Sequence, residues 1–273
     1  GQLGQALRDL LGDAAEFDYA SRRDIDLSDS SFLSARRWRD YATIINAAAY
    51  TAVDVAETPE GRVDAWSTNV TGVALLARIA SENRLTLVHV SSDYVFDGEK
   101  NGEYAEDDPL CPLGVYGQTK AAGDAIVATV PHHYIIRTSW VIGAGKNFVR
   151  TMASLAERGV DPNVVDDQVG RLTFTQDIAQ GIRHVLSPHA PYGVYNVSGS
   201  GTALSWADIA RRVFELVGAD PSRITGVSTE EYFASASVPV SPRPRNSALA
   251  LERITAAGFT PADHIDSLAR YLA

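Results

Sequence analysis

Short apolar runs alternate with helical segments along this chain, and that order constrains its fold more than any other feature. Strand-like runs occupy residues 16–20, 43–47, 85–90, 134–138 and 194–197. Helical segments are expected at 4–11, 59–83, within 112–129, and at 175–186, 204–217 and 262–272. Strands that alternate with helices pair in parallel, with helices on both faces of the sheet. The pattern therefore predicts an α/β fold with a doubly wound parallel sheet of the Rossmann type.

Charge and cysteine content narrow the class of protein. The 273 residues carry a net charge of -10, which argues against a nucleic-acid or membrane-surface partner, because both need a basic face. Cys111 is the single cysteine, so no internal disulfide can form. No apolar run approaches the roughly 20 residues needed to cross a bilayer. We therefore expect a cytoplasmic protein.

Ser92, Tyr116 and Lys120 are the strongest candidates for catalytic residues. Ser92 follows an apolar strand, and open α/β sheets bind ligands outside the carboxyl ends of their strands. Tyr116 and Lys120 are spaced i, i+4, which places both side chains on one face of a helix. A carbonyl that receives hydride needs a proton donor such as a phenol, a nearby ammonium favours the ionised phenol, and a serine hydroxyl can hold the same oxygen. The Tyr-x-x-x-Lys spacing is common by chance, so the prediction depends on the strand and serine that precede it.

Three other segments are typical of a dinucleotide site, and each has a plain structural alternative. Gly1 and Gly4 lie where a pyrophosphate could approach a helix N-terminus, although an ordinary turn has the same sequence. Residues 21–23, Ser-Arg-Arg, favour the 2′-phosphate of NADPH over NADH, unless they form a solvated loop. The small side chains of 46–51 suit a flat-lying dinucleotide or close helix packing. Asn69, inside a predicted helix, is either a satisfied core residue or a bridge to Lys120 through water.

Together these segments resemble the extended short-chain dehydrogenase/reductases, and among them the dTDP-4-dehydrorhamnose reductases. The resemblance runs through nearly the whole chain: GQLG at 1–4, DIDL at 24–27, NAAAYTAVD at 46–54, SSDYVFDG at 91–98, VYGQTK at 115–120, RTSWV at 137–141, NFV at 147–149, DDQVG at 166–170 and RPRNS at 243–247. The run SSDYVFDG and the pair RTSWV with NF are much more specific than the glycine turn. The family usually has threonine where Ser92 stands, and serine can do the same work.

The resemblance implies reduction of the C4 keto group of dTDP-4-dehydro-6-deoxy-L-mannose to dTDP-L-rhamnose, with NADPH, or alternatively NADH, as the cofactor. Tyr116 would donate the proton, Lys120 would hold the nicotinamide ribose and tune Tyr116, and Ser92 would bind the keto oxygen. The expected cofactor-binding residues are Gly1, Gln2, Leu3, Gly4, Arg22, Asp26, Leu27, Ala48, Ala49, Tyr50, Thr51, Tyr116 and Lys120. The expected substrate-binding residues are Ser92, Asp93, Tyr94, Trp140, Asn147, Gln168 and Arg243. Trp140 could instead be a core residue, and Arg243 could instead pair with surface acids.

The resemblance also implies a division into two parts. Residues 1–142 would form the NAD(P)-binding Rossmann domain and 143–273 mainly a smaller sugar-nucleotide-binding lobe, with the last Rossmann elements interleaved around 175–198. The family begins with a strand and a glycine that are absent here, and a sheet without that strand would expose two unpaired edges. We therefore expect further residues upstream of Gly1, or a fused upstream domain.

Some alternatives stay open at this point. Another sugar-nucleotide ketoreductase or epimerase would share the Ser92, Tyr116 and Lys120 set, and a non-catalytic regulatory subunit could use the same fold. Some family members are metal-bridged homodimers, so a homodimer and Mg²⁺ remain open, although no acidic cluster in the sequence requires a metal. Residues 236–247 are the most loop-like part of the chain, yet too basic and too rich in proline for a simple flexible linker.

Overall fold

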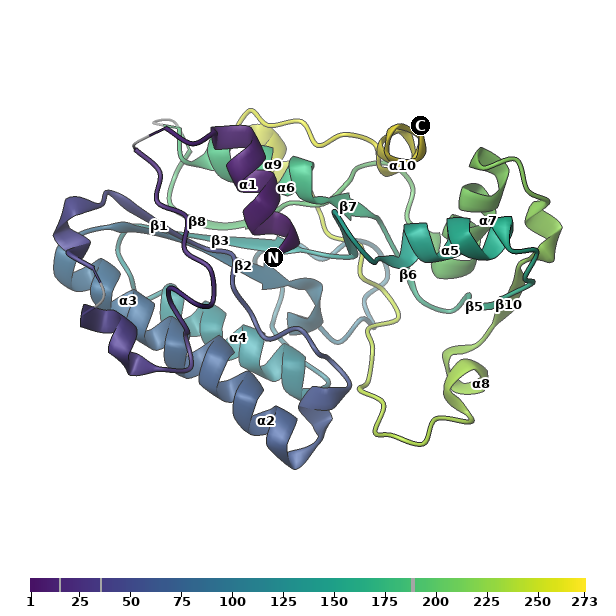
Figure 1. Cartoon of the computed structure of the whole chain (residues 1–273), viewed down its shortest axis with the longest axis horizontal. Coiled ribbons are helices and arrows are strands. Elements are labelled where there is room, and N and C mark those ends of the chain that lie inside the picture. Colours follow the sequence, from purple (N-terminus) through teal and green to yellow (C-terminus); the bar gives the residue numbers. More distant parts are fainter. Residues whose placement is uncertain (15, 35, 188–189) are drawn as a thin grey trace.

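The computed structural model describes residues 1–14, 16–34, 36–187 and 190–273. Its centre is a parallel four-stranded sheet in the order β1 (Thr43–Asn46), β2 (Thr86–Ser92), β3 (His133–Thr138) and β8 (Gly193–Asn196). Figure 1 shows this sheet in the larger of two lobes, with a smaller lobe beside it. The predicted α/β fold with a doubly wound parallel sheet is confirmed.

Helices cover both faces of the sheet because alternate strand residues point to opposite sides. On one face α1 (Gln2–Leu11) and α6 (Thr175–Val185) pack with the short α9 (Glu252–Ala256) over Val88 and Ile136. On the other face α3 (Gly72–Asn83) and α4 (Val115–Val127) pack over Leu87 and Ile135. Both faces of β2 and β3 are therefore buried, which explains why these strands appear as continuous apolar runs.

The smaller lobe is built on its own apolar core. Helices α5 (Phe148–Glu157), α7 (Trp206–Leu216) and α10 (His264–Leu272) pack together there, with residues such as Val149, Phe214 and Leu268 fully buried. Three two-stranded pairs join them: β4 (Val141–Ile142) with β7 (Thr173–Phe174), β5 (Asn163–Val165) with β10 (Thr225–Val227), and β6 (Val169–Gly170) with β9 (Leu204–Ser205). The remaining helical elements are α2 (Pro59–Trp66), α8 (Thr229–Phe233), the π turn Ser67–Thr71 and 3-10 turns at Ser30–Ser34, Trp38–Asp40, Val55–Glu57, Asp93–Val95 and Pro221–Arg223.

The predicted strand at 16–20 is wrong. Side-chain bonds anchor this segment instead: the Tyr19 hydroxyl donates to the Gly12 carbonyl at 2.7 Å, and Asp18 accepts from the Tyr41 hydroxyl at 2.7 Å. A lone extended segment gains no ladder hydrogen bonds, so strand propensity does not suffice. The single helix expected over 59–83 is also interrupted, by the π turn at Ser67–Thr71.

The loop at 236–247 ties the two lobes together. It leaves α8 in the smaller lobe and returns across the molecule to the larger one (Figure 1). Its Ser241 amide donates to Asp54 at 3.0 Å and its Arg243 forms an ion pair with Asp54 at 2.8 Å. These bonds explain why the segment is more polar and more constrained than a free linker.

Candidate active site

Ser92 and Tyr116 meet at the carboxyl end of β2. Ser92 is the last residue of the strand, and its hydroxyl accepts the Tyr94 amide at 3.2 Å and lies 3.0 Å from Asp93 Oδ1. Tyr116 lies in the first turn of α4, with its phenol in hydrogen-bond reach of Ser92 and its ring edge-to-face with Tyr94 at 5.3 Å. Gly117 allows this approach, because a Cβ there would lie 2.2 Å from the Tyr94 carbonyl oxygen. The structure thus brings the predicted acid and the predicted carbonyl-binding hydroxyl together.

The phenol of Tyr116 is strongly biased toward its protonated form. Burial raises the pKa of Tyr116 to about 12, opposed by the Ser92 hydroxyl and reinforced by the negative charges of Asp93 and Asp124. The ammonium of Lys120, expected to favour the ionised phenol, is not among the groups that shift this pKa. A protonated phenol is the form that a reductase needs, because the reduced carbonyl oxygen must receive a proton.

Lys120 lies one turn farther along α4 and is completely buried. Its Nζ donates to the Val90 carbonyl at 2.7 Å and lies 3.3 Å from His89 Nε2. Burial lowers the pKa of Lys120 to about 8, against the opposing effect of Asp124. Tyr116 and Lys120 lie four residues apart in α4, as predicted, whereas the contact of His89 with the lysine is not predictable from the sequence.

Asp93 is a buried carboxyl at the edge of this group. Its Oδ2 has no hydrogen-bond partner among the described residues. Burial raises the pKa of Asp93 to about 6, although hydrogen bonds from Ser247 and Ser92 favour the carboxylate. A free acceptor beside Ser92 suits a hydroxyl-bearing ligand such as a sugar.

The raised pKa of Asp93 predicts a specific pH dependence of stability. Its folded pKa of about 6 exceeds the ordinary value of 3.8 for an aspartate, so its contribution to stability is present below pH 4 and is lost as pH rises toward 6. Asp93→Asn removes this titration and keeps the shape. We expect the free energy of unfolding of the variant, relative to wild type, to increase between pH 4 and 7 in urea titrations. A difference that is constant over this range would contradict the burial of a titrating carboxyl.

The predicted cofactor-binding residues include glycines at the start of α1 and leucines whose side chains are buried. Gly1 is the N-cap of α1 and makes no side-chain hydrogen bond there, and a Cβ at Gly1 or Gly4 would meet no atom within 4 Å. Leu3 is buried in the core under α1, and Leu27 is buried against Gly72. Their side chains therefore serve packing, and only their backbone could meet a ligand.

Two asparagines hold the loop that follows β1. Asn46 Oδ1 accepts the Ala48 amide at 3.1 Å. Asn69 accepts the Tyr50 amide at 2.9 Å and donates to the Tyr50 carbonyl at 3.1 Å and to Thr119 at 3.0 Å. The side chain of Asn69 is thus hydrogen-bonded within the core, which is one of the two alternatives expected from the sequence. These bonds fix the backbone around Ala48, Ala49, Tyr50 and Thr51 at the carboxyl end of the sheet.

The seven predicted substrate-binding residues do not all lie together in one site. Ser92, Asp93 and Tyr94 are adjacent, and the charge of Arg243 acts on the pKa of Tyr94. Asn147 instead caps α5 and donates to the Gly143 carbonyl at 2.8 Å and to the Tyr271 hydroxyl at 2.8 Å. Its amide is engaged by these bonds, so Asn147 has a structural role at the start of α5.

Trp140 and Gln168 lie in the smaller lobe near its border. Trp140 has a φ of 45°, a left-handed conformation that is uncommon outside glycine, and stacks on Trp206 with ring centroids 3.7 Å apart. Gly170 lies flat against the Trp140 ring, where a Cβ would come within 2.8 Å. Gln168 donates to Thr229 at 2.8 Å. Backbone strain that is maintained by close packing often marks a ligand site. Trp140 has both a strained φ and closely packed neighbours.

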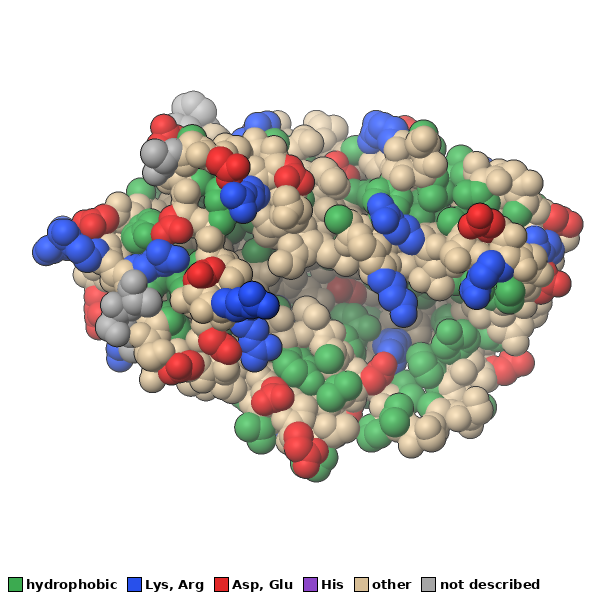
Figure 2. All heavy atoms as spheres, in the orientation of Figure 1, with side chains coloured by type: hydrophobic (Ala, Val, Ile, Leu, Met, Phe, Trp, Pro, Cys, Tyr) green, Lys and Arg blue, Asp and Glu red, His purple; other side chains and the backbone are tan. Residues whose placement is uncertain are grey.

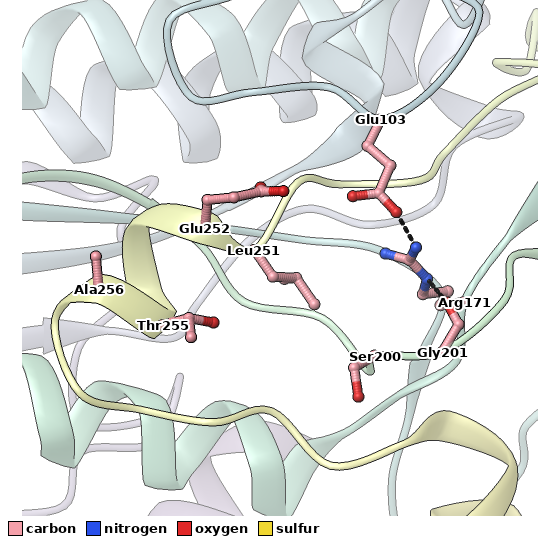
Figure 3. Close-up of a pocket in the computed structure, with 8 residues that line it drawn as sticks. All are labelled: Glu103, Arg171, Ser200, Gly201, Leu251, Glu252, Thr255 and Ala256. Atoms are coloured by element: carbon pink, nitrogen blue, oxygen red, sulfur yellow. Dashed lines mark hydrogen bonds and ion pairs between the residues drawn. The ribbon is translucent and has the colours of Figure 1, made fainter.

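Figure 2 shows a hollow in the surface between the two lobes, bordered partly by hydrophobic side chains. A separate pocket, shown in Figure 3, lies around Arg171 and is lined by Glu103, Ser200, Gly201, Leu251, Glu252, Thr255 and Ala256. Arg171 pairs there with Glu103 and donates to the Gly201 and Leu249 carbonyls. Its guanidinium is therefore engaged in holding the fold, and none of the catalytic candidates lines this pocket.

Among the residues that the structure describes, no cluster of three or more His, Cys, Asp or Glu side chains is arranged to hold a metal ion. Over the same part of the chain, no helix combines the length and apolar character that a membrane span requires.

The chain is similar to known proteins over nearly its whole length. The family model described as "RmlD substrate binding domain" matches residues 1–273. A dTDP-4-dehydrorhamnose reductase of Aggregatibacter actinomycetemcomitans is 38% identical over 96% of this chain and 92% of the relative. A crystal structure of a dTDP-4-dehydrorhamnose reductase from Clostridium acetobutylicum superposes with a TM-score of 0.90 at 33% identity, covering 100% of this chain and 95% of that one. The NADP complex of the Bacillus anthracis enzyme gives a TM-score of 0.87 at 29% identity, with 100% and 95% covered.

Proposed function

This chain belongs to the RmlD substrate binding domain family, and we propose that it uses NADPH to reduce the C4 keto group of dTDP-4-dehydro-6-deoxy-L-mannose, giving dTDP-L-rhamnose. The observation that carries the proposal is the meeting of Ser92 and Tyr116 at the carboxyl end of β2, with Lys120 buried one turn beyond. This arrangement supplies a proton donor and a carbonyl-binding hydroxyl within one site.

The residues present fit a dinucleotide. The N-terminus of α1 would offer amide groups to a pyrophosphate, with Gly1, Gln2 and Gly4 around it. The backbone of 48–51, fixed by Asn46 and Asn69, would lie along the cofactor. Bound NADPH would supply the hydride.

The chain's own residues then perform the proton chemistry. Ser92 turns its hydroxyl from Asp93 to the C4 carbonyl oxygen of the sugar and holds it. Tyr116 gives its phenol proton to that oxygen as hydride arrives at C4, so one hydride and one proton convert the ketone to an alcohol. Asp93 and Tyr94 orient the sugar, with Trp140 of the smaller lobe and Arg243 of the loop that joins the lobes on the other side.

The experiment that tests this function is a cofactor-oxidation assay. Purified protein is mixed with the keto sugar nucleotide, generated in place by the preceding epimerase, and with NADPH or NADH in turn. We expect NADPH oxidation that requires the sugar nucleotide. Cofactor binding without oxidation would favour a different keto sugar or a non-catalytic role.

Arg22 should decide the preference between the two cofactors. It is exposed and its Nε lies 3.2 Å from Asp26 Oδ2, so it can turn to a 2′-phosphate at little cost. We expect Arg22→Ala to weaken NADPH binding by about tenfold, the loss of one charge-assisted contact, and to leave NADH binding unchanged. Fluorescence titration with both cofactors measures this, with Arg78→Ala, from an exposed pair on α3, as the control. An equal loss for NADPH and NADH would place the 2′-phosphate elsewhere.

A further inference from the structure

Lys120 is the end of a buried chain of three side chains beneath the candidate active site. Asn46 closes β1, His89 lies in β2 and Lys120 lies on α4, with 5%, 0% and 1% of their surfaces exposed. His89 Nδ1 is 3.1 Å from Asn46 Nδ2, and His89 Nε2 is 3.3 Å from Lys120 Nζ. The reaction proposed above gives Asn46 and His89 no role toward the lysine.

The Ala48 amide fixes the direction of the hydrogen bonds in this chain. It donates to Asn46 Oδ1 at 3.1 Å, so the amide nitrogen of Asn46 faces His89. An amide nitrogen can only donate, so His89 Nδ1 is the acceptor and the ring proton of a neutral imidazole sits on Nε2. Burial holds the pKa of His89 well below its ordinary value, so the ring is neutral.

The Nε2–H group of His89 therefore faces the nitrogen of Lys120. An ammonium has donors only and cannot accept this hydrogen, whereas an amine has a lone pair that can. In either form Nζ keeps a hydrogen for the Val90 carbonyl at 2.7 Å. The contact with His89 thus stabilises the amine relative to the ammonium.

We propose that Asn46 and His89 are positioning residues that set the protonation state of Lys120 by holding the Nε2–H of His89 against its nitrogen. The inference rests on the proposed function and deepens it.

Other groups around Lys120 also affect the equilibrium between its amine and ammonium forms. Tyr116 and Asp124 share α4 with it, and the negative charge of Asp124 favours the ammonium. Asp124 is in turn paired with Arg137 of β3 at 3.0 Å. With burial included, the pKa of Lys120 falls to about 8, so a change in His89 should move its titration within a measurable range.

Two variants separate the tautomer of His89 from simple charge. Asn46→Asp keeps the acceptor for Ala48 but removes the donor, so the ring proton moves to Nδ1 and Nε2 becomes an acceptor for the ammonium. His89→Gln removes the Nε2–H without adding charge, because its amide can turn its oxygen toward Lys120. We expect the basic limb of the pH profile to move to higher pH in both variants, for NADPH binding and for turnover alike. The shift should be about one pH unit or more in Asn46→Asp. His264→Gln, a buried histidine in the smaller lobe, is the control and should leave the limb in place.

Nitrogen-15 NMR of the histidine rings tests the same inference without substrate. The wild-type protein should show His89 protonated on Nε2 across neutral pH, and Asn46→Asp should show it protonated on Nδ1. A wild-type ring protonated on Nδ1, or a basic limb that stays in place in both variants, overturns the inference. Because the tautomer is measured without cofactor or sugar, its failure is distinguishable from failure of the reductase proposal.

Discussion

Tyr116→Phe should lower the turnover of NADPH oxidation by about a hundredfold or more, the usual cost of removing a general acid. Tyr116 is the buried phenol in reach of Ser92, and its pKa of about 12 means that it holds a proton at neutral pH. Phenylalanine keeps the edge-to-face contact with Tyr94, so the fold and the binding of NADPH should be retained. Steady-state kinetics and a cofactor titration on the same preparation measure both quantities.

Tyr134→Phe is the matched control for this substitution. Tyr134 is also buried, and its hydroxyl donates to the Ala190 carbonyl at 2.7 Å, away from the catalytic candidates. Its loss should cost about 1 kcal/mol of stability and leave turnover near the wild-type value. Near-wild-type turnover in Tyr116→Phe would remove Tyr116 as the proton donor.

Arg137→Met should destabilise the fold by about 3–5 kcal/mol, because it leaves a buried carboxylate without its partner. Arg137 Nε lies 3.0 Å from Asp124 Oδ2 with side chains only 5% and 2% exposed, and its Nη1 donates to the Glu106 carbonyl at 2.8 Å. Burial already raises the pKa of Asp124, and losing the guanidinium, which lowers it, raises it further. The loss of stability should therefore be smaller at acid pH, where Asp124 is neutral, than at pH 7. Urea unfolding at both pH values measures it.

Two controls make the Arg137 result specific. Arg78→Met removes an exposed pair with Glu82 at 3.7 Å and should cost less than about 1 kcal/mol. The double variant Asp124→Leu, Arg137→Met removes both buried charges and should recover much of the loss. A double variant no more stable than Arg137→Met alone would show that packing of the arginine, rather than the orphaned charge, causes the effect.

The sequence predicted the site best where spacing alone determines geometry. Tyr116 and Lys120 share a helix face because they are four residues apart, and Ser92 reaches them because parallel strands end at one edge of the sheet. The buried strands were likewise predictable from their apolar runs. The roles assigned to these residues in binding and catalysis remain predictions that the variants above test.

Contacts between distant segments could not be predicted in this way. Strand propensity at 16–20 does not reveal whether a neighbouring strand pairs with it, and none of the described strands does. The side chain of Leu27 is buried because Gly72 leaves room for it, and Asn147 is occupied by Tyr271 from the far end of the chain. His89 could not be predicted because a polar residue inside an apolar strand has no periodic signal, although its position in a buried run is itself unusual.

The most direct test of the central claim is to follow the hydride. NADPH carrying deuterium at the transferable position of C4 of the nicotinamide is incubated with the protein and the keto sugar nucleotide, and the product is examined by NMR. The account predicts deuterium at C4 of a dTDP-L-rhamnose product and none elsewhere in the sugar. Deuterium at another carbon, or no transfer while NADPH and sugar nucleotide both bind, would contradict it.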